Sequence, residues 1–221
     1  MNEKTLLRRK GKSYSIGEEI FSSVSHGIAT LLSIAALVIL TVFAVKTGEG
    51  IYLFCALTYT ITLIMLFLCS TLYHAITNSK AKKVLQVLDH CAIFLLIAGT
   101  YTPFTLLALN STFGTIIFSL IWSFAVLGIV LNAINIKKFK ILSMILYVAM
   151  GWCVVVVFKP LVASITNVSV ALLLIGGLCY TVGIIFYSLK KKLYFHSIWH
   201  IFVLAGAVLH FFSVLSIFLN I

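Results

Sequence analysis

Seven long runs of apolar residues divide this sequence, and they constrain its fold more than any other feature. The runs cover residues 20–45, 51–74, 84–109, 114–134, 141–158, 168–189 and 194–219. The hydrocarbon core of a bilayer is about 30 Å thick, so a helix of about 20 apolar residues crosses it. Inside lipid a helix satisfies its own backbone hydrogen bonds. The sequence therefore predicts an all-α integral membrane protein with seven transmembrane helices.

Composition and charge exclude two broad classes. Of the 221 residues, 62% are hydrophobic and only 10% are charged, whereas a soluble domain carries about 25% charged residues. The formal net charge of +11 can indicate nucleic-acid binding, but the cations form no stripe with interleaved aromatic residues. We therefore expect membrane lipids, and no nucleic acid, as partners.

Two boundaries between the runs are the least distinct. Residues 90–136 contain no charge, and we divide them at Asn110–Gly114, where turn-forming residues cluster. The fifth run is short, and we expect it to end at Lys159-Pro160. The first run is longer than the apolar core of a signal peptide, so it should be an uncleaved first span.

The positions of the cations predict the topology. All but two of the 16 lie before the first run or after the second, fourth and sixth. They are Lys4, Arg8, Arg9, Lys10, Lys12, Lys80, Lys82, Lys83, Lys137, Lys138, Lys140, Lys190, Lys191 and Lys192. The positive-inside rule then predicts a cytoplasmic N-terminus and an extracytoplasmic C-terminus. We expect a basic cytoplasmic tail over residues 1–17 and one seven-helix domain over residues 18–221.

Ionisable side chains inside the runs are the main functional signal. An aspartate at the centre of a span costs about 2.5–3.5 kcal/mol on insertion scales, so such residues are functional candidates by default. The candidates are His26, His74, Asp89, His90, His196, His200 and His210, with Glu18 and Glu19 at the mouth of the first span.

Four of these side chains are predicted to lie at one depth. His74, Asp89, His196 and His200 each lie four to eight residues from the lysines at the cytoplasmic end of their span. At 1.5 Å per helical residue, this places them about 6–12 Å from those lysines. Three helices thus bring polar groups to the same level of the cytoplasmic leaflet.

The spacing of His196 and His200 places both imidazoles on one helix face. With His74 they would offer three nitrogen ligands, and three imidazoles with a carboxylate or water suit tetrahedral zinc. No glutamate follows His196, so the H-E-x-x-H protease motif is missing. The alternative is a hydrogen-bonded polar cluster without metal. Ser70, one turn from His74, would either bond to its own helix or, beside a metal, hold a water or orient Asp89.

Two further histidines are expected to lie outside this cluster. His90 projects about 100° away from Asp89, which favours an interfacial or packing role. His210 lies about 15 Å deeper than His200, which is too far to bind the same metal. Its ring should instead find its hydrogen-bond partners within the bundle.

The remaining three candidates, Glu18, Glu19 and His26, lie near the cytoplasmic start of the first span, close in depth to the cluster. A water-accessible helix end would explain them. The alternative is a supporting or gating role beside the cluster.

Taken together, the motifs resemble those of the bacterial hemolysin III family, which belongs with the progestin and adipoQ receptors, including the adiponectin receptors. The resemblance runs from Glu18 to the end of the chain. It is carried by Glu18-Glu19, Ser25-His26-Gly27, Ser70-x-x-x-His74, Asp89-His90, Gly99-Thr100-Tyr101-Thr102-Pro103 and His196-x-x-x-His200.

The resemblance implies a seven-helix protein of the bacterial cell membrane with its N-terminus inside and a zinc ion in the cytoplasmic leaflet. The implied ligands are His74, His196 and His200, with Asp89 holding a water on the zinc and Ser70 nearby. The chain has no counterpart of the long cytoplasmic domain of the animal receptors, so we infer no protein partner.

Two functions follow as hypotheses from this resemblance. Because the wider superfamily includes alkaline ceramidases, the first is zinc-dependent hydrolysis or sensing of a membrane lipid, with Asp89 transferring the proton to the leaving group. The second is a non-enzymatic protein with a structural zinc that perturbs or regulates membranes, as the name hemolysin suggests. A channel or transporter is disfavoured because no series of polar residues crosses the membrane.

Overall fold

The computed structural model describes residues 14–189 and 192–220, and all regular structure in these residues is helical. In chain order the elements are α2 (Ile16–Thr47), α3 (Gly50–Ala75), α4 (Ser79–Pro103), the π-helical turn η1 (Phe104–Ala108), α5 (Thr112–Asn135), α6 (Lys140–Trp152), the 3-10 turn η2 (Cys153–Val155), α7 (Phe158–Ser164), α8 (Asn167–Ser188) and α9 (Phe195–Leu219). The predicted all-α membrane fold is confirmed for the described residues. Most of the predicted basic tail lies outside them, as do Lys190 and Lys191.

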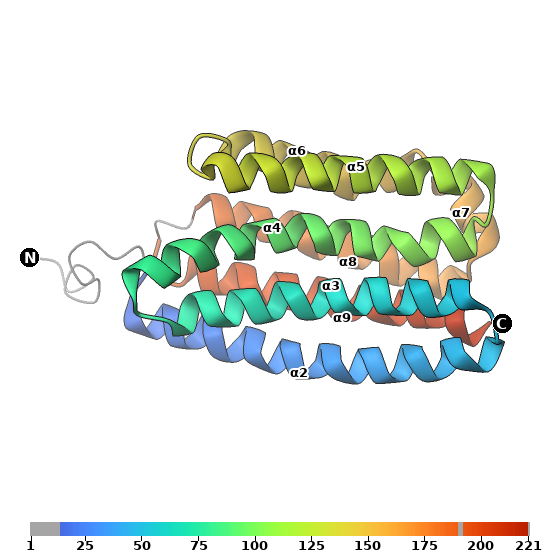
Figure 1. Cartoon of the computed structure of the whole chain (residues 1–221), viewed down its shortest axis with the longest axis horizontal. Coiled ribbons are helices and arrows are strands. Elements are labelled where there is room, and N and C mark those ends of the chain that lie inside the picture. Colours follow the sequence, from blue (N-terminus) through green and yellow to red (C-terminus); the bar gives the residue numbers. More distant parts are fainter. Residues whose placement is uncertain (1–13, 190–191, 221) are drawn as a thin grey trace, which may run out of the picture.

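The number of membrane-length helices is six, or seven if one bent pair forms a single span. That pair joins Lys140–Val155 to Phe158–Ser164 at an angle of 57°. The start of α2 and the end of α9 lie at opposite ends of the bundle (Figure 1), which requires an odd number of crossings. The bent pair therefore serves as the fifth of seven spans.

The expected end of the fifth span at Lys159-Pro160 is wrong. Helix α7 continues through both residues to Ser164. Pro160 lies in the first turn of α7, where backbone N–H groups have no partner within the helix, so its missing N–H costs nothing there. The chain bends before the proline, at Val156 and Val157, between η2 and α7.

The helices pack against one another in a continuous series. Helix α2 packs against α3 and α9, α3 against α4, α4 against α5, and α8 against α9. In Figure 1, α2 borders one side of the bundle, and α5 and α6 border the other. The outward faces remain apolar: Leu31, Ile134 and Ile141 are 68%, 68% and 73% exposed. Such exposure suits lipid contact, since lipid tails are as apolar as these side chains.

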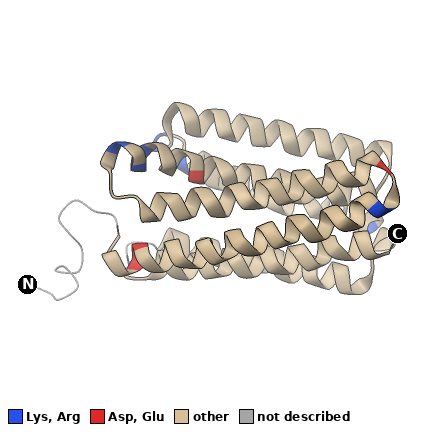
Figure 2. Cartoon of the chain, turned by 60° about the horizontal axis from the view of Figure 1, so that its bottom comes forward, with Lys and Arg blue, Asp and Glu red and all other residues tan. Residues whose placement is uncertain are grey.

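The described cations lie at the two ends of this bundle and not along the helices (Figure 2). At the end where α2 begins are Lys80, Lys82, Lys83, Lys137, Lys138, Lys140 and Lys192. Lys46 and Lys159 belong to the opposite end. The predicted separation of charge is thus present, and the assignment of the richer end to the cytoplasm remains a prediction.

Side-chain caps set the starts of α2 and α5. The Ser15 hydroxyl accepts a hydrogen bond from Glu18 N at 3.2 Å, and Ser15 N donates to Glu18 Oε2 at 2.7 Å, a capping box. Helix α2 therefore begins at Ile16, four residues before the apolar run, and includes Glu18 and Glu19 in its first turn. The division at Asn110–Gly114 is confirmed: the Ser111 hydroxyl caps α5 by accepting from Gly114 N at 3.1 Å.

Candidate metal centre

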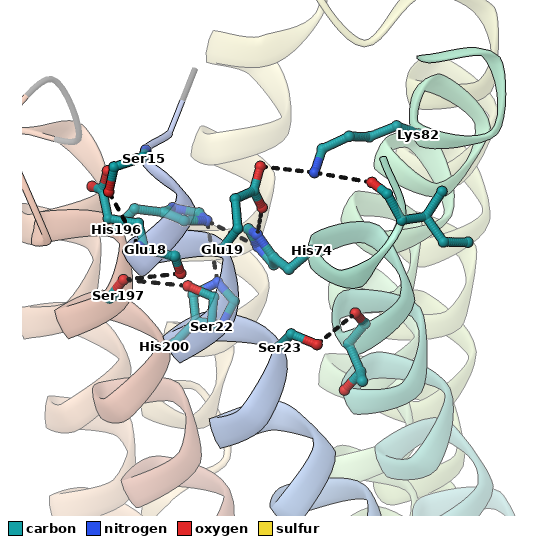
Figure 3. Close-up of polar contacts among 12 residues, drawn as sticks. Ser15, Glu18, Glu19, Ser22, Ser23, His74, Lys82, His196, Ser197 and His200 are labelled. Carbon is teal, nitrogen blue, oxygen red and sulfur yellow. Dashed lines mark hydrogen bonds and ion pairs between the residues drawn. The ribbon is translucent and has the colours of Figure 1, made fainter. Parts of the chain in front are cut away.

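Three imidazoles converge at the end of the bundle where α2 begins. His74, near the end of α3, faces His196 and His200 in the first turns of α9 (Figure 3). Their ligand atoms all lie within 4.8 Å of one another, and the residues are 4%, 3% and 0% exposed. The sequence-based prediction that these three residues meet is confirmed.

The spacing of the nitrogens fits a tetrahedral metal. His74 Nε2 lies 3.3 Å from His196 Nε2, and His196 Nε2 lies 3.1 Å from His200 Nε2. Two nitrogens that are each about 2.0–2.1 Å from a zinc ion at the tetrahedral angle stand about 3.3 Å apart. Three imidazole nitrogens are a donor set that zinc sites use. The residues present therefore fit zinc.

Helix α2 holds the start of α9 in place. The Glu18 carboxylate accepts a hydrogen bond from Tyr194 N at 2.9 Å, just before α9 begins. One turn on, the Ser22 and Ser197 hydroxyls lie 3.3 Å apart. Because Glu18 also caps its own helix, these contacts fix the start of α9 against the start of α2.

His74 is part of a chain of polar side chains. Its Nδ1 lies 2.6 Å from Glu19 Oε2, and the other carboxylate oxygen, Oε1, accepts a hydrogen bond from Lys82 Nζ at 2.7 Å (Figure 3). The chain therefore joins α3, α2 and α4 on one side of the histidines. The carboxylate also determines which nitrogen of His74 faces the cluster.

Aromatic rings cover His196. The Tyr14 ring stacks on it at 4.3 Å between centroids, and the Trp199 ring lies at 5.1 Å. Burial raises the pKa of the Tyr14 hydroxyl, so this residue stays neutral. Trp199 is one helical turn from His196, and that spacing could have indicated the contact. Nothing in the sequence around Tyr14 marks it as part of the site.

Asp89 and Ser70 are buried but do not belong to the three-histidine group. Among the described residues, that group contains no carboxylate. Asp89 is 4% exposed, and its Oδ2 lies 3.4 Å from His90 Nδ1. Ser70 is 1% exposed, and its hydroxyl has no hydrogen-bond partner among the described residues, so it does not bond to its own helix. Both predicted roles remain predictions.

The other ionisable residues have separate positions. The interpretation of a water-accessible helix end is wrong for Glu18 and His26, which are 0% and 1% exposed. His26 instead contacts the site: its Nε2 lies 3.4 Å from the carbonyl oxygen of His200.

His90 Nε2 lies 3.3 Å from the Tyr187 hydroxyl, which fits the expected packing role. His210 is buried away from the cluster, with Nε2 3.0 Å from the carbonyl oxygen of Leu173.

A cavity of about 190 Å³ adjoins the site indirectly. None of the three clustered histidines lines it, but His26 and Trp199 do, and their rings lie 3.9 and 4.9 Å from the His200 ring. Asp89, His90 and His210 also line the cavity, and most of the other lining residues are apolar. Two of the lining residues, Trp152 of α6 and Leu174 of α8, are 40% and 36% exposed.

These features define a multi-pass membrane protein with a buried histidine cluster that can hold a metal ion. Comparison with known proteins identifies its family. Residues 14–211 match the family model described as Haemolysin-III related. The chain therefore belongs to the haemolysin III family.

Relatives in two kingdoms are similar to this chain. It is 44% identical to the Hemolysin-3 homolog of Bacillus subtilis (strain 168), over 91% of this chain and 95% of that protein. It is 42% identical to Hemolysin-3 of Bacillus cereus, over 90% and 91% of the two chains. The human monocyte to macrophage differentiation factor is 28% identical over 71% of this chain and 67% of that protein.

Proposed function

We propose that this protein is a zinc-dependent hydrolase of the bacterial plasma membrane that cleaves an amide bond in a membrane lipid such as ceramide. The observation that carries the proposal is the convergence of three imidazole Nε2 atoms near an apolar cavity, to which His26 and Trp199 join them. A structural cluster would need no adjoining cavity, whereas an enzyme acting on lipid needs a place for the acyl chain.

His74, His196 and His200 would hold the zinc ion, leaving one position open. When bound there, zinc would lower the pKa of a water toward neutrality and polarise a carbonyl group. The burial of all three histidines would exclude bulk water and strengthen electrostatic interactions at the site. These properties suit hydrolysis of an amide, which is a poor electrophile.

Asp89 would serve as the general base. It would accept a proton from the attacking water and return it to the leaving amine, a role typically worth about 10²–10⁴-fold in rate. Its place in the lining of the cavity supports this role, because a substrate bound there could place its head group against it. The free hydroxyl of Ser70 would orient the water.

The substrate would enter from the bilayer. The partial exposure of the lining residues Trp152 and Leu174 supports an opening of the cavity between α6 and α8. An acyl chain lying between these helices would exchange one apolar environment for another, so its transfer would need little desolvation.

A non-enzymatic function is the second candidate. Two similar proteins carry the name Hemolysin-3, and a metal held by residues of α3 and α9 would also fix those helices to each other. In that case zinc would stabilise a protein that perturbs or maintains membranes, and no lipid would be cleaved.

Lipid turnover by purified protein distinguishes the two candidates. We expect release of fatty acid from ceramide or a related acyl amide, its loss on treatment with a chelator, and its recovery when zinc is returned. Gly177 lines the cavity, and a Cβ there would meet no atom within 4 Å. Gly177→Phe should therefore fill the cavity and lower turnover at least tenfold without changing zinc content.

Leu178→Phe is the matched control, since Leu178 is the next residue and is 51% exposed toward lipid. It should leave turnover unchanged. Wild-type protein that contains zinc but cleaves no member of a broad lipid panel would reject the hydrolase proposal and favour the non-enzymatic one.

A further inference from the structure

We propose that Glu19 is a positioning residue for the metal: it fixes His74 in the orientation and tautomer that presents Nε2 to the ion, and Lys82 fixes Glu19. This inference rests on the proposed metal site and adds a residue from a helix that supplies no ligand. Neither Glu19 nor Lys82 belongs to the ligand set implied by the sequence.

The contact between Glu19 and His74 is short and shielded. Glu19 Oε2 lies 2.6 Å from His74 Nδ1, and the side chains are 17% and 1% exposed. An ionised carboxylate only accepts hydrogen bonds, so Nδ1 must carry the proton in this pair. The lone pair of the neutral ring then lies on Nε2, the atom that faces His196 at 3.3 Å. The carboxylate thus selects the tautomer that can bind a metal.

Lys82 holds the carboxylate from the other side. Its Nζ donates to Glu19 Oε1 at 2.7 Å and to the carbonyl oxygen of Ile76 at 3.4 Å. The same ammonium group lies 4.9 Å from the centroid of the Tyr73 ring. These partners fix Lys82 at the α3–α4 connection, so the two oxygens of Glu19 are each committed to one neighbour.

His200 differs from His74 because no hydrogen bond from the described residues orients its ring from the side opposite the cluster. Its Nδ1 has no hydrogen-bond partner in the part of the chain that the structure describes. The ring is placed by packing instead, at 3.9 Å from the centroid of His26 and 4.9 Å from that of Trp199. At His74, by contrast, the Glu19 carboxylate introduces negative charge next to the site. That charge favours a cation and increases the basicity of His74 toward it.

Zinc affinity, measured by competition with a chelator on the full-length protein, tests the role of Glu19. Glu19→Ala should weaken binding by about 10–100-fold, the usual effect of removing a partner that orients a metal ligand. Glu19→Gln keeps an acceptor oxygen for His74 Nδ1 but loses the charge, so it should bind zinc with intermediate affinity. Because Gln has nearly the same shape, this variant also serves if the alanine variant does not fold.

Variants at Lys82 test whether it acts through Glu19. Lys82→Met should weaken zinc binding several-fold, and Lys82→Arg, which keeps the ion pair, should restore it. In the Glu19→Ala background, Lys82→Met should have no further effect, because a residue that acts only through Glu19 has nothing left to hold. An additive loss in the double variant would show that Lys82 influences the metal independently.

A matched control separates this role from a general effect of charge. Glu49→Gln removes the same charge at the opposite end of the bundle, where Glu49 makes no capping bond, and should leave zinc affinity unchanged.

The outcomes distinguish this inference from the proposed function. Wild-type protein that binds no zinc would overturn both. If wild-type protein binds zinc and both Glu19→Ala and Glu19→Gln bind it with the wild-type affinity, only the positioning role is overturned. A fall in the melting temperature of the metal-free Glu19 variants that has no accompanying loss of affinity would overturn that role too.

Discussion

His74 Nε2 and His196 Nε2 lie 3.3 Å apart, although 122 positions separate the two residues in the chain. Their helices, α3 and α9, both pack against α2, so α2 brings the two imidazoles together. A metal between them would tie α3 directly to α9. The same atoms would then contribute both to stability and to chemistry, and the predictions below are chosen to separate these contributions.

The topology is tested by labelling single cysteines. Lys138 belongs to the lysine-rich end of the bundle and Lys159 to the opposite end. In a background without native cysteines, Lys138→Cys should react only when reagent reaches the cytoplasm, and Lys159→Cys should react from outside the cell. A C-terminal reporter active in the cytoplasm would contradict the seven-span arrangement.

Close packing of α4 on α5 is tested at Gly128. A Cβ at this position would meet the ring of Phe94, which is fully buried. Gly128→Ala should therefore destabilise the protein by about 1–3 kcal/mol, the usual cost of overpacking a core, and should lower the melting temperature. At Gly151, inside α6, an added Cβ meets nothing within 4 Å, so Gly151→Ala should leave the melting temperature equal or higher.

Asp89→Asn separates catalysis from coordination. If Asp89 is the general base, the amide still fills its place, so zinc content and melting temperature should largely survive while lipid-amide turnover falls about 10²–10⁴-fold. If Asp89 completes the metal coordination, zinc content and stability should fall together. Wild-type turnover in a variant that retains its zinc would remove Asp89 from the mechanism.

The sequence predicts the membrane fold well because lipid leaves a chain few options. Runs such as 51–74 and 194–219 differ from the observed α3 and α9 by at most one residue at each end. The boundary at residues 141–158 is less accurate because a bend inside a span leaves no break in hydropathy. The start of α2 also extends past the apolar run, since the cap formed by Ser15 and Glu18 is polar.

The ligand set was predictable for a related reason. His74, His196 and His200 share a depth that can be counted from the nearby lysines, and the i, i+4 spacing of the last two gives their shared face. The direction in which the side chains of the first turn of α2 point could not be predicted from such residue spacing. The contacts of Glu19 and Tyr14 with the site depend on helix packing, and burial of Glu18 depends on its bonds across to α9.

The metal content of purified protein tests the central claim most directly. Wild-type protein should contain about one zinc ion per chain, and His196→Ala with His200→Ala should remove it, since one remaining imidazole cannot form a tetrahedral site. Loss of zinc should also lower the melting temperature, because ligands from two helices couple metal binding to folding. Wild-type protein that purifies without metal, takes up none when zinc is added, and melts at the same temperature as the double variant would show that the three histidines are only a polar cluster.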